Sequence, residues 1–159
     1  MLPAETLWPF FAASMALAIA PGPDNLFVLA QSAQHGRAAG LSVTLGLCTG
    51  LLGHTAAVAL GIAAILQTSP LAFNAVKWVG ALYLLYLARQ AWRASTQRIE
   101  NEQSPPLSLI ALYRRGIIMN GTNPKVSIFF LAFLPQFADP ARGALVLQFI
   151  LLGGVFIAA

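Results

Sequence analysis

Residues 20–25 constrain this chain most, because they interrupt an apolar run that is long enough to cross a bilayer. The run covers residues 7–30, and Pro21, Gly22 and Pro23 stand inside it, followed at once by Asp24. Proline lacks a backbone N–H and clashes with the preceding turn, so a regular helix cannot continue through this stretch. Broken backbone at membrane depth must be buried in protein or line an aqueous cavity, and a carboxylate there indicates a functional site.

A second interruption lies about a hundred residues further on, at residues 120–125. It falls inside another apolar run, residues 116–137, and it carries Lys125 where the first interruption carries Asp24. Two interrupted apolar segments at corresponding places in two halves are typical of secondary transporters that are built from internal repeats.

The composition places the whole chain in a membrane. Hydrophobic residues make up 58% of the 159 residues and charged residues only 9%, with a mean hydropathy of +0.73. Soluble domains contain roughly 25% charged residues. The basic residues gather at the ends of the apolar runs, so the net charge of +4 does not indicate a nucleic-acid partner. The sequence offers no paired carboxylates, histidine cluster or Ser-His-Asp set with usable spacing, so we expect no enzyme and no metal or cofactor.

The hydrophobic pattern predicts an all-α helical bundle with about five spans. We expect the first and fourth spans to be broken, and the fifth to cover about 24 Å of the ~30 Å hydrocarbon core. The predicted spans are residues 7–30, 41–66, 71–92, 116–137 and 144–159. Residues 1–92 would form a first three-span repeat, 93–115 a cytoplasmic linker, and 116–159 a second, incomplete repeat.

The distribution of basic residues predicts the orientation. Cytoplasmic loops of membrane proteins carry the excess of lysine and arginine. Arg142 is the only basic residue in the loops after the second and fourth spans, so we expect the N-terminus on the periplasmic side. The loops after the first and third spans contain His35, Arg37, Arg89, Arg93, Arg98, Arg114 and Arg115.

A new half-helix is expected to begin after each interruption. Gly22 is the expected N-cap of the first, with Pro23 as its first residue and Asp24 in its first turn. Asn123 is a favourable N-cap for the second and Pro124 a favourable first residue. Such N-termini present unpaired N–H groups that attract anions. Because the first and fourth spans run in opposite directions, we expect the two N-termini to point toward each other.

Lys125 is the more informative of the two charged residues. Asp24 suits the first turn of a helix for structural reasons alone, whereas a cation in the first turn opposes the helix dipole. Lys125 therefore needs a nearby anion, either Asp24, a substrate carboxylate or both. A site that pairs Lys125 with a carboxylate and Asp24 with an amino group fits an amino acid, and Asp24 is the candidate carrier of a coupling proton.

Three further features are candidates for accessory roles. Gly46 and Gly50 form a small-xxx-small pair, which predicts close packing against the broken helix or, alternatively, a homodimer. His54 lies in the middle of the second span as a packing residue or a proton relay. Lys77 lies inside the third span and either reaches the membrane interface or contributes to the site.

The motifs at both interruptions resemble those of the LysE/RhtB family of amino-acid exporters. The matching residues are Pro-Gly-Pro-Asp at 21–24 and Asn-Pro-Lys at 123–125, supported by Lys-Trp-Val-Gly-Ala-Leu-Tyr-Leu at 77–84 and Leu-Pro-Gln-Phe at 134–137. The resemblance extends over the whole chain.

The resemblance implies a bacterial inner-membrane protein with six spans in two inverted three-span repeats. It implies export of small amino acids or their derivatives by proton antiport, with the bilayer as the other partner. The sixth span is not found in the 159 residues, so we expect residues 1–159 alone to insert without exporting. A passive channel for small polar solutes is the alternative function. The expected substrate- and proton-binding residues are Pro21, Gly22, Pro23, Asp24, Asn123, Pro124 and Lys125.

Overall fold

The protein is a bundle of helices. The computed structural model describes residues 2–62, 69–93 and 107–159, and every regular element in these ranges is helical, as the hydrophobic pattern predicts. The elements are α1 (Ala4–Ile19), α2 (Pro23–His35), α3 (Arg37–Ala57), η1 (Val58–Ile62), α5 (Pro70–Arg93), α6 (Leu109–Thr122), α7 (Pro124–Ile128), η2 (Phe129–Phe133), η3 (Leu134–Phe137), η4 (Pro140–Arg142) and α8 (Leu145–Ala158).

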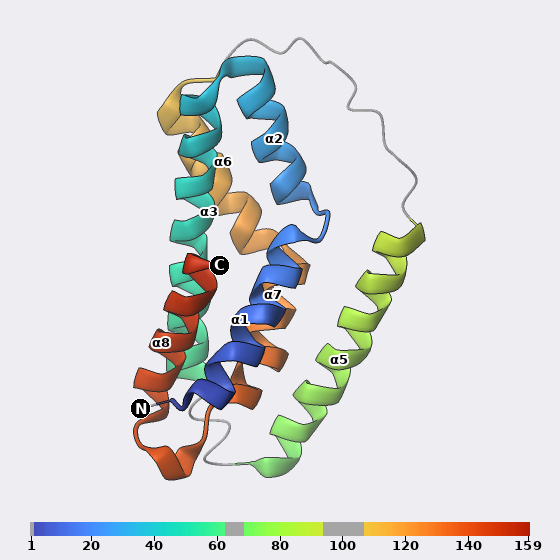
Figure 1. The fold of residues 1–159 in the computed structure, drawn as a ribbon, viewed down its shortest axis with the longest axis vertical. Coiled ribbons are helices and arrows are strands. Elements are labelled where there is room, and N and C mark those ends of the chain that lie inside the picture. The colour runs from blue at the N-terminus through green and yellow to red at the C-terminus, as the bar shows by residue number, and fades with distance from the viewer. Residues whose placement is uncertain (1, 63–68, 94–106) are drawn as a thin grey trace.

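Both predicted helix breaks are confirmed. The chain bends by 58° between α1 and α2 and by 51° between α6 and the helical segment Pro124–Phe137. The two bent pairs run in opposite directions along the long axis of the molecule (Figure 1). The N-termini of α2 and α7 therefore face each other near the middle of the bundle.

Length and composition identify the segments that are suited to crossing a membrane. Among the described residues, the stretch Arg37–Gly61 is long and apolar enough alone, and each bent pair qualifies if it counts as one span. Helix α8 is apolar but has only 14 residues. Helix α5 matches the predicted third span in its bounds but does not meet this criterion of length and hydropathy.

The start of the fourth span was predicted too late. Helix α6 begins at Leu109, capped by the Ser108 hydroxyl, rather than at residue 116. Arg114 and Arg115 therefore lie on a helix, where their side chains are exposed, and not in a loop. The division of the chain into repeats stays a prediction, and residues 94–106 of the expected linker lie outside the described residues.

Helices α3 and α6 are in backbone contact at their glycines. A Cβ atom built on Gly46 would collide with the Tyr113 carbonyl, and one on Gly116 with the Val43 carbonyl. Gly50 similarly admits the side chain of Asn120, which would lie 2.7 Å from a Cβ atom there. The prediction of close packing against the broken helix is confirmed. Because α6 occupies this face within one chain, Gly46 and Gly50 are buried there, and a homodimer stays a prediction.

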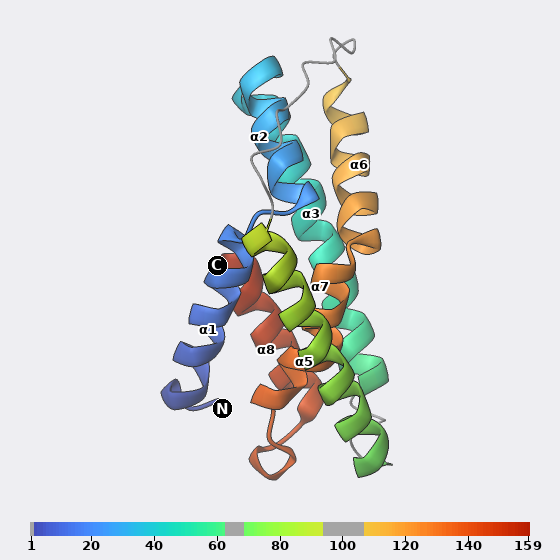
Figure 2. The ribbon, with the colours of Figure 1, turned by 90° about the vertical axis from the view of Figure 1, so that its right-hand side faces the viewer.

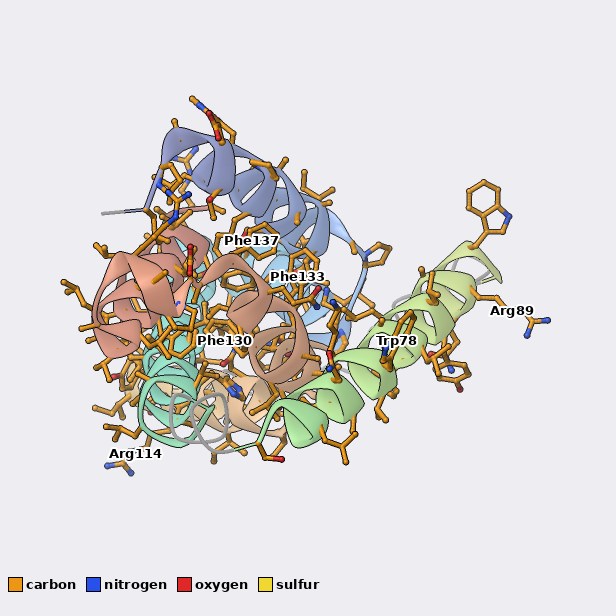
Figure 3. The ribbon with its side chains drawn as sticks, turned by 90° about the horizontal axis from the view of Figure 1, so that it is seen from below. Trp78, Arg89, Arg114, Phe130, Phe133 and Phe137 are labelled. Carbon is orange, nitrogen blue, oxygen red and sulfur yellow. The ribbon has the colours of Figure 1, made fainter. Side chains whose placement is uncertain are left out.

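A phenylalanine cluster holds the lower half of the bundle together. Ring centroids lie 5.1 Å apart for Phe10 and Phe137, 5.0 Å for Phe129 and Phe156, and 5.1 Å for Phe130 and Phe156. These rings join α1, η2, η3 and α8 into one apolar core. Viewed from below, Phe130, Phe133 and Phe137 lie between the helices, whereas Arg89 and Arg114 project outward (Figure 3).

Helix α5 lies at the side of the bundle and packs along α7 and η2 (Figure 2). A Cβ atom on Gly80 would collide with the Ala132 side chain, so the glycine sets the closest approach. An apolar groove of about 310 Å³ follows this contact and is lined by Ala75, Val76, Val79, Gly80, Ile128, Leu131 and Ala132.

Candidate functional site

The chain geometry at both breaks matches the prediction from proline and asparagine. Gly22 is the N-cap of α2 and Pro23 its first residue, and Asp24 lies in the first turn. Asn123 is the N-cap of α7, where its Oδ1 accepts a hydrogen bond of 3.0 Å from the backbone N–H of Lys125. Pro124 follows as the first helical residue, where its missing N–H costs no helical hydrogen bond.

The two breaks are joined by a hydrogen bond between side chains. The amide Nδ2 of Asn123 donates to Oδ2 of Asp24 over 2.8 Å, although 99 positions separate the two residues in the sequence. Both side chains are buried, with 8% of Asp24 and 4% of Asn123 exposed. A hydrogen bond to an ionised carboxylate is among the stronger kinds, so this contact fixes the two N-termini relative to each other.

Lys125 is stabilised by the carbonyl end of α1. Its Nζ donates to the Leu17 and Ala20 carbonyls, both at 3.0 Å. These carbonyls belong to the last turn of α1, where the helix dipole favours a cation. Among the described residues, no ion pair joins Lys125 to Asp24. The α1 carbonyls thus take the place of a direct contact with Asp24, and the expected part of a substrate carboxylate stays a prediction.

Two neighbouring residues complete the first break. A Cβ atom on Gly22 would lie 3.2 Å from Nζ of Lys125, so glycine leaves room for the ammonium group. Asn25 donates from Nδ2 to the carbonyls of Ala18 and Ala20. The sequence prediction missed this role of Asn25, although asparagine next to a helix break is a signal for such capping.

His54 and Asn120 extend the polar region toward α3. His54 Nε2 donates to the Asn120 carbonyl at 3.2 Å, and its ring lies 5.6 Å from the Phe130 ring. This contact favours the packing interpretation of His54. Asn120 is 3% exposed, and its Oδ1 accepts no hydrogen bond from the described residues. The sequence prediction did not single out Asn120, whose place at the start of the second interruption was the available signal.

Lys77, the remaining accessory candidate, is not joined to the cluster. It is half-buried on α5, and within the described part of the chain no hydrogen bond or ion pair links it to either break. Within the described ranges, no group of three or more histidine, cysteine, aspartate or glutamate side chains is placed to hold a metal ion. The site thus consists of one carboxylate, one ammonium and two carboxamides at a pair of helix breaks.

Comparison with known proteins identifies the family. The LysE type translocator family matches residues 15–159. A homoserine/homoserine lactone efflux protein of Salmonella typhimurium is 34% identical over 149 residues, which are 94% of this chain and 72% of that protein. An uncharacterized membrane protein of Vibrio cholerae is 35% identical over 133 residues, 84% of this chain and 65% of that protein.

The chain spans about two thirds of the length of these relatives, and no solved structure matches it. The match covers both breaks, the buried Asp24 and the Asn123-Pro124-Lys125 turn. This chain is therefore a multi-pass membrane protein that belongs to the LysE type translocator family.

Proposed function

We propose that the protein exports small amino acids or their derivatives across the bacterial inner membrane in exchange for protons. The observation that carries the proposal is the buried carboxylate of Asp24, held at one helix break by Asn123 from the other break. An ionisable group is costly inside a membrane, by at least about 2.5 kcal/mol, and is typically kept there for transport. The similarity to homoserine/homoserine lactone efflux proteins supports an amino-acid derivative as the substrate.

The two broken helices suit alternating access. Each break divides a bent pair into halves that meet in the middle of the bundle, and the polar contacts between the breaks involve only a few side chains. A rocking motion of one half against the other would expose Asp24 first to one side and then to the other. The inverted repeat of the family is part of this proposal.

An efflux assay tests the proposed function. Cells that express the protein are loaded with labelled L-homoserine, and its efflux is followed with and without a protonophore. We expect efflux above that of cells with an empty vector, and we expect the protonophore to remove most of the difference. Efflux that is the same with and without the protonophore would indicate a passive facilitator. The absence of efflux for L-homoserine and for every other amino acid tested would refute export.

The proposed orientation has its own test. In a Cys48→Ala background, which lacks the single native cysteine, Gln34→Cys at the end of α2 and Ala141→Cys in η4 place exposed thiols at opposite ends of the molecule. We expect a membrane-impermeant maleimide to label Ala141→Cys in intact cells and Gln34→Cys only after permeabilisation. The reverse pattern would place the N-terminus in the cytoplasm.

A further inference from the structure

The two carboxylate oxygens of Asp24 have different surroundings. Oδ2 accepts the 2.8 Å hydrogen bond from Asn123, whereas Oδ1 is buried and accepts no hydrogen bond from any described residue. Leaving a buried acceptor without a donor is unfavourable, and more so when the acceptor is charged. Such an atom in a native protein calls for a specific partner. Asp24 therefore presents one satisfied oxygen and one that is open to a donor.

The polar side chains around Asp24 do not supply this donor. Asn123 is engaged at both ends, because its Oδ1 caps the Lys125 N–H while its Nδ2 holds Asp24. Lys125 directs its ammonium to two carbonyls of α1 instead. Since no donor among the described residues reaches Oδ1, its partner comes from outside the protein.

We propose that Oδ1 of Asp24 binds the primary ammonium of the substrate and the transported proton alternately, and that Asn123 is the positioning residue that leaves only this oxygen open. The inference rests on the proposed export function and names the part of the substrate that the site recognises. Because Lys125 is already stabilised by α1, a substrate carboxylate is not required. Amino acids and their lactones share the ammonium group and fit the same oxygen.

The exchange of the substrate ammonium for a proton breaks and re-forms a single O–H bond of Asp24. When the ammonium approaches, the O–H bond of the protonated Asp24 breaks and the proton leaves to water on the open side. The resulting carboxylate then accepts a hydrogen bond from the N–H of the substrate. On the opposite side a proton binds Oδ1 again and the ammonium departs. Each cycle thus moves one ammonium against one proton.

Asp24 is the group that is able to make this exchange. The other charged or titratable groups on α2 and on the helices that contact it or hold Asp24 are His35 on α2, Arg37, Cys48 and His54 on α3, Tyr113, Arg114 and Arg115 on α6, and Lys125 on α7. Lys125 and the three arginines are cationic and repel an ammonium ion. The Arg115 guanidinium lies 4.8 Å from the centroid of the Phe27 ring, and His54 already donates to the Asn120 carbonyl.

Competition for one oxygen predicts a pH-dependent affinity. Binding of L-homoserine to the purified protein is measured by titration calorimetry from pH 5 to pH 8, in buffers with different ionisation enthalpies. Because a proton and the ammonium compete for Oδ1, Kd should rise as the pH falls, by up to about tenfold per pH unit, and binding should release up to one proton. N-acetyl-L-homoserine keeps the carboxylate but lacks the ammonium, so we expect it to bind at least tenfold more weakly at every pH.

Variants of Asp24 and Asn123 distinguish the roles of the two Asp24 carboxylate oxygens. Asp24→Asn should bind L-homoserine weakly and without pH dependence, whereas Glu5→Gln, a matched change at an exposed acid of α1, should keep the full slope. Asn123→Ser retains a capping oxygen but is too short to hold Asp24, so we expect it to shift the midpoint of the pH profile. Melting curves confirm that each variant is folded.

Two results would overturn the inference. One is that Kd for L-homoserine depends on pH in Asp24→Asn as it does in the unmodified protein. The other is tight binding of N-acetyl-L-homoserine to the unmodified protein, a test that needs no variant. Binding does not depend on transport, so pH-linked binding without efflux from cells would support the inference and refute the export function. If neither L-homoserine nor any other amino acid tested binds at all, both fail.

Discussion

Replacing Asp24 with asparagine should abolish proton-coupled export and leave the protein in the membrane. Asparagine has nearly the same shape, and its Oδ1 retains an acceptor for the amide of Asn123. It cannot gain or lose a proton, so the coupling step is removed while the contact between the two breaks is preserved. We expect net efflux driven by the pH gradient to fall to the level of cells with an empty vector. Efflux of labelled amino acid and the amount of protein in the membrane fraction are the two measurements.

Glu5→Gln is the matched control for this change. Glu5 is an exposed acid in the first turn of α1, far along the helix from the break. Its substitution removes the same charge and should leave efflux close to that of the unmodified protein. Full gradient-driven efflux by Asp24→Asn would show that another group carries the proton.

Replacing Lys125 with methionine should weaken both export and the folded state. Methionine has a similar length but donates no hydrogen bond, so the Leu17 and Ala20 carbonyls lose the ammonium at the end of α1. Loss of the donor at the Leu17 carbonyl costs roughly 1–3 kcal/mol where water does not reach it, whereas the Ala20 carbonyl keeps its hydrogen bond from Asn25. We expect a clearly lower melting temperature in detergent and at least a tenfold loss of efflux, because the end of α1 loses its hydrogen bonds to α7.

Lys77→Met is the control for the lysine. Lys77 is also half-buried, but it has no hydrogen bond or ion pair that ties it to the breaks. Its replacement should lower the melting temperature much less than that of Lys125. Equal effects of the two substitutions would mean that burial of the lysine stem, and not the contact with α1, accounts for the loss.

The two breaks were predictable because their causes are local. Proline at positions 21, 23 and 124 removes backbone donors, and asparagine at 123 is a natural N-cap, so the ends of α2 and α7 follow from a few adjacent residues. The apolar runs likewise predict the helical spans. The start of α6 was missed because Arg114 and Arg115 suggested a loop. Both side chains are exposed on α6, so a helix leaves their charges accessible as a loop would.

The partners of the buried charges were not predictable in the same way. Opposite charges at similar depth suggested that Lys125 pairs with Asp24, yet Lys125 binds the carbonyl end of α1 and Asp24 binds Asn123. These choices depend on helix ends about a hundred residues apart and on their relative rotation, which no local pattern encodes. Backbone carbonyls carry no sequence signature, because every residue has one. The sequence therefore specifies which polar groups enter the membrane, and the packing of the two broken helices selects their partners.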